Sequence, residues 1–60
     1  MIREYVLIVT EDEETRTYVT QTYFAGKGLV SPTCATMDAS VSIVVRELAT
    51  LRRAAAKGAL

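Results

Sequence analysis

Residues 37–57 read MDASVSIVVRELATLRRAAAK, and their apolar residues recur at alternating spacings of four and three. This spacing is typical of one apolar face of an α-helix of about five turns. The face consists of Met37, Val41, Val44, Leu48, Leu51 and Ala55. Because the chain holds few other candidates for a core, this face must cover something. We expect it to cover a small sheet formed by the N-terminal half.

The ends of this helix carry suitable capping residues. Either Thr36 or Asp38 can serve as the N-cap. With Thr36 in that role, Asp38 falls in the first turn, where a negative charge favours the helix dipole. The helix is expected to run to about Lys57, with Gly58 as the residue that ends it.

Three segments before the helix have the composition of strands. Residues 4–10, EYVLIVT, are apolar on both alternating faces, which predicts a central strand or one with a layer on each side. Residues 16–24, RTYVTQTYF, are rich in threonine, which predicts a strand with one solvated face or at a sheet edge. Residues 29–35, LVSPTCA, predict a short third strand or an extended segment, and Pro32 means that such a strand lies at an edge or begins after the proline.

Two turns separate these strands. Residues 11–15, EDEET, are expected to form an acidic hairpin loop, and residues 25–28, AGKG, a turn in which both glycines need positive φ. The predicted fold class is therefore α+β. It is an antiparallel β-hairpin or three-stranded meander packed against one long C-terminal helix, in a single domain over residues 1–60.

The size and composition of the chain indicate that it needs a partner. A chain of 60 residues buries only about 60% of its unfolded surface and is marginally stable alone. Cys34 is the single cysteine and histidine is absent, which excludes an internal disulfide and a zinc site built on both residue types. Since half of the residues are hydrophobic, we expect a homodimer or a complex with another protein.

The charges balance in number but not in position. Seven basic and seven acidic residues cancel, yet residues 1–38 sum to −3 and residues 39–60 to +3. This polarity suits contacts between protein surfaces. It indicates neither a whole-domain nucleic-acid binder, which would be basic, nor a DNA mimic, which would be acidic. The lone cysteine and the absence of a signal peptide or membrane span predict a cytoplasmic protein without membrane contact.

The sequence carries no motif for chemistry. Gly26 and Gly28 lack the longer phosphate-loop pattern, and the acidic run lacks the ligand spacing of a calcium loop. Cys34 has no base beside it in sequence. We therefore expect no enzyme activity, no catalytic residue, no cofactor and no metal.

The candidate sites are surfaces rather than catalytic groups. Apolar residues surround much of the helix at residues 41–45, which fits either a broad core face or a second interface. The residues expected to carry self-association or partner binding are Tyr18, Thr20, Thr22, Ile43 and Val45. An alternative nucleic-acid contact would use Arg46, Arg53 and Lys57, which lie near one helical face.

The order of elements in residues 5–51 resembles HicB-type antitoxin domains. The resemblance lies in Asp12 and Glu13 in the hairpin, in Gly28-Leu29, and in Thr36 before residues 37–39. It implies a β-β-β-α unit, similar to part of a ribonuclease H fold, that self-associates and masks a small RNA-cleaving toxin. The chain departs from the family at residues 23–27, where a proline-containing segment is usual, and no DNA-binding module follows, so operator binding is not implied.

Together these patterns predict a small non-enzymatic protein-interaction module that self-associates and binds or inhibits a protein partner, as an antitoxin does. One alternative is a phage- or mobile-element-encoded inhibitor of a host defence or regulatory protein. Another is a small nucleic-acid-binding module that uses the basic end of the helix.

Overall fold

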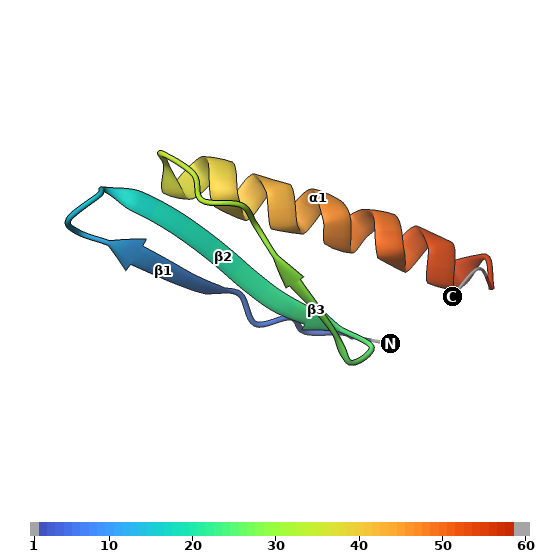
Figure 1. Ribbon diagram of the computed structural model, residues 1–60. Helices are drawn as coiled ribbons and strands as arrows, with labels where there is room; N and C mark the ends of the chain where they lie inside the picture. Colours follow the sequence, from blue (N-terminus) through green and yellow to red (C-terminus); the bar gives the residue numbers. More distant parts are fainter. Residues whose placement is uncertain (1, 59–60) are drawn as a thin grey trace.

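The computed structural model describes residues 2–58. It contains β1 (Ile8–Asp12), β2 (Thr17–Phe24), β3 (Lys27–Val30) and α1 (Met37–Ala56). The strands form one antiparallel sheet in the order β1-β2-β3, and α1 lies across one face of it (Figure 1). The predicted α+β class is confirmed, and the sheet is the three-stranded meander.

Strand pairing divides the sheet residues between two faces. Val9 pairs with Thr20, and Thr22 pairs with Leu29, on the side covered by α1, which we call the helix face. Ile8, Gln21 and Val30 form a row across all three strands on the opposite side, which we call the open face. Side chains alternate along a strand, so every second residue belongs to each face.

The strand order corrects one expectation. β1, which was expected at the centre or with a layer on each side, is an edge strand exposed on both faces. β2 has one solvated face, as expected, and is the central strand. β1 also begins later than expected, because the chain before Ile8 packs toward the helix. There Tyr5 packs against the core near Phe24, and the Thr22 hydroxyl donates to the Val6 carbonyl at 2.7 Å.

Both turns occur where the sequence predicts them. In the first, Asp12 Oδ1 accepts the Glu14 N–H at 3.0 Å, and Arg16 has a φ of 56°. In the second, Ala25 and Gly26 have φ values of 52° and 81°, as a two-residue hairpin turn requires. Gly28 was expected in the turn with a positive φ, which is wrong: it lies in β3 without a positive φ, and a Cβ there would stand 3.5 Å from the Tyr23 ring.

The core lies between β2, β3 and the middle of α1. Phe24, Leu29, Val44 and Leu48 are buried there, and Leu51 packs against them. The predicted apolar stripe is thus confirmed in its centre. Its ends, Met37 and Ala55, are exposed. A 20-residue helix is about 30 Å long and extends past the short strands.

A buried pair of hydroxyls joins the helix to the central strand. Thr20 Oγ1 and Ser40 Oγ lie 2.7 Å apart, and both residues are fully buried. Ser40 donates its proton to the Met37 carbonyl at 3.0 Å, so Thr20 is the donor between the two. Because serine is small, the first turns of α1 can approach β2 closely. No local sequence pattern indicates this pair.

The capping residues behave as predicted. Thr36 is the N-cap, with extended backbone and an Oγ1 that accepts the Ala39 N–H at 3.1 Å, and Asp38 lies in the first turn. Lys57 caps the other end, followed by Gly58 with a φ of 75°. These caps satisfy backbone groups that a helix leaves unpaired at its ends.

Two adjacent valines provide a test of the packing of α1. Val44 is 0% exposed and Val45 is 46% exposed. Val44→Ala removes buried methyl groups and should lower the free energy of unfolding by about 2 kcal/mol. Val45→Ala should lower it by less than about 0.5 kcal/mol in dilute protein, where association contributes little. Urea denaturation measures both, and equal losses would contradict the packing.

Candidate protein-interaction site

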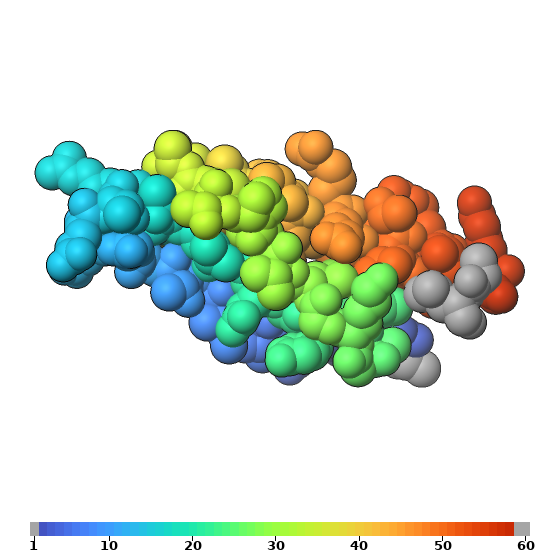
Figure 2. Space-filling model, in the orientation of Figure 1, coloured from blue at the N-terminus to red at the C-terminus, as the bar shows by residue number. Residues whose placement is uncertain are grey.

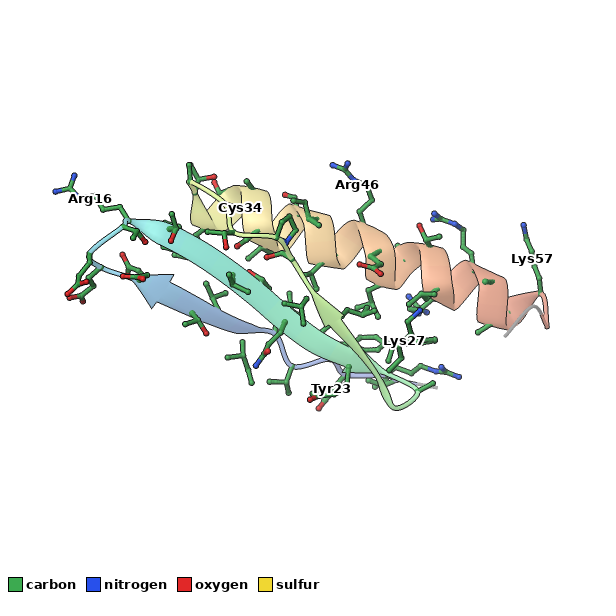
Figure 3. The ribbon with its side chains drawn as sticks, in the orientation of Figure 1. Arg16, Tyr23, Lys27, Cys34, Arg46 and Lys57 are labelled. Carbon is green, nitrogen blue, oxygen red and sulfur yellow. The ribbon has the colours of Figure 1, made fainter. Side chains whose placement is uncertain are left out.

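The open face is a solvent-exposed apolar surface. Ile8 is 51% exposed, Val30 58% and Tyr23 69%, and Val19 lies half-buried among them. Figure 3 shows Tyr23 on the side of the sheet away from α1. An uncovered face of an antiparallel sheet is usually polar, so the exposed apolar side chains make this face a candidate binding surface.

Charge is nearly absent from the open face. Among the strand residues of this face within residues 2–58, only Asp12 is charged, and it lies next to the acidic turn. The neutral polar members are Thr10, Thr17 and Gln21. Desolvating such a surface costs little, because no buried charge would be left without a partner.

The second candidate surface is the outer edge of β1, which we call the β1 edge. Tyr18 and Cys34 exchange both backbone hydrogen bonds, at 2.8 and 2.9 Å, on the side of β2 away from β1. Backbone groups alternate in direction along a strand, so the N–H and C=O groups of Val19 and Gln21 point toward β1. Their hydrogen-bond partners there are Thr10 and Ile8. The N–H and C=O groups of Val9 and Glu11 consequently point outward along the β1 edge.

The strand residues expected at an interface lie elsewhere. Thr20 and Thr22 are buried under α1, and Tyr18 is half-buried in the central strand. The expectation that Thr20 and Thr22 carry self-association or partner binding is wrong, because both side chains are buried and their hydroxyls are satisfied inside the fold. For Tyr18 the expectation stays a prediction. Sequence reasoning missed Ile8, Val9, Tyr23 and Val30. The apolar composition of both faces of residues 4–10 was the available signal.

On α1, Val45 is exposed and Ile43 is half-buried. Val45 precedes Arg52 by seven residues, about two turns, so both lie on one flank of the helix. The Arg52 guanidinium lies 6.0 Å from the centre of the Tyr5 ring, in the segment that leads into β1. The flank that carries Val45 is therefore the flank nearer the segment before β1.

The basic residues considered for nucleic-acid contact lie on the solvent side of α1. Arg46, Arg53 and Lys57 are exposed, and Figure 3 shows Arg46 and Lys57 pointing away from the sheet. Arg53 Nη2 donates to Thr50 Oγ1 at 3.4 Å. Cations near the C-terminus of a helix are favoured by its dipole, which accounts for Arg53 and Lys57 without a ligand.

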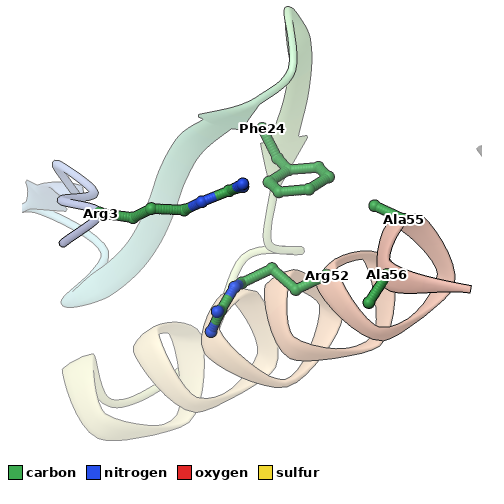
Figure 4. Close-up of a pocket in the computed structure, with 5 residues that line it drawn as sticks. All are labelled: Arg3, Phe24, Arg52, Ala55 and Ala56. Carbon is green, nitrogen blue, oxygen red and sulfur yellow. The ribbon is translucent and has the colours of Figure 1, made fainter. Parts of the chain in front are cut away.

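A cavity of about 240 Å³ lies between the segment before β1 and the end of α1, lined by Arg3, Phe24, Arg52, Ala55 and Ala56. Figure 4 shows the Arg3 side chain extending toward the Phe24 ring, while the Arg52 guanidinium is turned away. The two guanidiniums therefore do not converge on one position.

The groups capable of chemistry are dispersed. Cys34 is half-buried, and its thiol donates to the Pro32 carbonyl at 3.3 Å. Within residues 2–58, no three His, Cys, Asp or Glu side chains come together as metal ligands. In the same part of the chain, no helix has the length and apolar character needed to cross a membrane.

One tyrosine is electrostatically perturbed. Tyr18 Oη donates to Glu11 Oε2 at 3.1 Å. This hydrogen bond raises the pKa of Tyr18, and the negative charge of Glu11 raises it further, because both disfavour the phenolate. The contact is present at neutral pH and is lost as the pH rises through the raised pKa.

Comparison with known proteins assigns no relative: no protein-family model, no curated protein and no solved structure matches the chain. The resemblance to HicB-type antitoxin domains therefore stays a prediction. The interpretation of the site rests on its geometry.

The Tyr18–Glu11 contact predicts a measurable pKa change. Glu11→Gln removes the charge and should lower the pKa of Tyr18 toward the ordinary tyrosine value, which an NMR titration of the Tyr18 ring measures. Glu13→Gln removes a charge from the neighbouring turn and should leave the pKa nearly unchanged. Equal effects of both substitutions would show that the Glu11 contact does not cause the shift.

Proposed function

We propose that this protein is a small non-enzymatic protein-interaction module that self-associates and binds, and thereby inhibits, a protein partner. The observation that carries the proposal is the exposed apolar open face around Ile8, Tyr23 and Val30. Large apolar side chains that gather on one exposed face of a small protein often serve in binding.

The size of the domain supports the same proposal. Only four hydrophobic residues form the buried core of the described chain, while as many apolar residues of the strands remain exposed. The exposed set is Ile8, Val9, Tyr23 and Val30. Covering this set with a partner adds apolar burial that the domain lacks alone.

An antitoxin-like role is the specific form that we favour for the inhibitor, in the cytoplasm, and the resemblance in the order of elements supports it. A phage- or mobile-element-encoded inhibitor of a host protein would use the same open face. The two forms differ in the partner, so identification of the partner distinguishes them.

A photo-crosslinking experiment tests the proposal. A photoreactive phenylalanine analogue replaces Tyr23 on the open face, and in a matched chain it replaces Arg46 on the solvent side of α1. Irradiation in cells of the source organism, followed by mass spectrometry, should give discrete protein adducts from position 23 and far fewer from position 46.

Adducts to protein from position 46 alone would contradict the proposal for the open face. Nucleic-acid adducts from position 46 would favour the alternative that uses Arg46, Arg53 and Lys57. That alternative also predicts a gel shift at low salt that weakens steeply as salt is added.

A further inference from the structure

We propose that a second copy of this chain pairs with the β1 edge, antiparallel and about a twofold axis, so that two three-stranded sheets become one six-stranded sheet. This inference rests on the proposed self-association and specifies where and how it occurs. The partner is the same strand of an identical chain, which gives a closed, isologous contact.

The first support is the composition of β1. An edge strand is normally protected by charge, proline or a bulge. In β1 the charges are confined to Glu11 and Asp12 at one end, and the other end presents Ile8 on the open face and Val9 on the helix face, both exposed. Val9 and Glu11 direct backbone N–H and C=O groups outward. Pairing along the β1 edge satisfies these groups and makes β1 the interior strand that its sequence predicts.

The second support is the charge distribution along the molecule. The protein is elongated, with a longest dimension of 42 Å, and Figure 2 shows the β1–β2 turn at one end and the end of α1 at the other. The turn carries the acidic residues Glu11, Asp12, Glu13 and Glu14. The opposite end carries Lys27, Arg52, Arg53 and Lys57.

This polarity selects the antiparallel orientation. Antiparallel β1 strands place the acidic turn of each copy beside the basic end of the other, which is favourable. A parallel arrangement would place the two acidic turns together, and like charges at short distance oppose association. The charges thus argue for a second copy as the occupant of the β1 edge.

The third support lies above β1. The flank of α1 that carries Val45 is the one nearer the segment before β1, and Val9 lies on the helix face of β1. In the paired sheet, the two helices would line a groove over the β1 strands, and Val9 and Val45 of both copies would fill it. Val45 and Val9 are then both exposed in a single copy because the second copy is what covers them.

The register follows from the acidic residues. Placing Glu11 opposite Glu11 of the second copy would oppose like charges directly. Centring the twofold axis on Val9 places Glu11 opposite Leu7 instead and pairs the outward backbone groups of Val9 with those of the other Val9. Such a hydrogen-bonded pair has Cα atoms about 5.5 Å apart.

A proline substitution tests this arrangement in the full-length chain. Proline at an outward-facing edge position is compatible with the β1–β2 ladder but removes the N–H that the second copy needs. Val9→Pro should raise the dimer dissociation constant about 100-fold, as expected for two lost hydrogen bonds. Val9→Ala is the matched control, and its dissociation constant should rise by at most about tenfold, because it loses only side-chain contact. Sedimentation equilibrium measures both, and circular dichroism confirms that each variant is folded.

A folded Val9→Pro variant that dimerises as well as Val9→Ala would overturn the pairing while leaving self-association through the open face intact. A wild-type chain that is monomeric at all concentrations would overturn self-association itself. If Val9→Pro fails to fold, Val9→Cys in a Cys34→Ser background decides the question. A disulfide-linked dimer under mild oxidation is the expected result, since about 5.5 Å between Cα atoms permits the bond. Failure to form it would overturn the pairing.

Discussion

The structure depends on how a single helix is held against the central strand. Thr20 and Ser40 bring the first turns of α1 close to β2, and Val44 and Leu48 continue the contact along the helix. A helix with its side chains is about 10 Å wide, and neighbouring strands lie about 4.8 Å apart. One helix therefore covers β2 and β3 but leaves β1 and the whole open face without a second layer.

This limited coverage links the fold to its proposed role. Where α1 covers the sheet, even the polar side chains Thr20 and Thr22 are buried and hydrogen-bonded. Where α1 is absent, apolar side chains such as Ile8 and Tyr23 are exposed. A small domain that is stable alone would bury its apolar side chains and expose its polar ones. A second protein surface would cover the exposed apolar side chains here, and the opposite charges at the two ends of the molecule would orient that surface.

Features that depend on neighbours in the sequence were predictable. The helix, its Thr36 N-cap and the acidic turn follow from local spacing and capping chemistry, and the structure confirms them. The strand order is that of the predicted meander, but which strand faces are buried was not predictable, because it depends on which strands the helix contacts. The threonines of β2 favoured exposure of their side chains to solvent. The hydroxyls of Thr20 and Thr22 instead bond to Ser40 and to the Val6 carbonyl, which are distant in sequence. The apolar β1 suggested a central strand, and within one chain it lies at an edge.

Amide hydrogen exchange at the β1 edge measures most directly whether a protein surface completes the sheet. The N–H groups of Val9 and Glu11 point away from β2, so within one copy they have no strand to protect them, whereas that of Thr10 is bonded to β2. If a second copy pairs with the β1 edge, exchange at Val9 and Glu11 should be slow in concentrated protein and faster on dilution, with Thr10 less affected. Fast exchange at Val9 and Glu11 at every concentration would contradict this pairing.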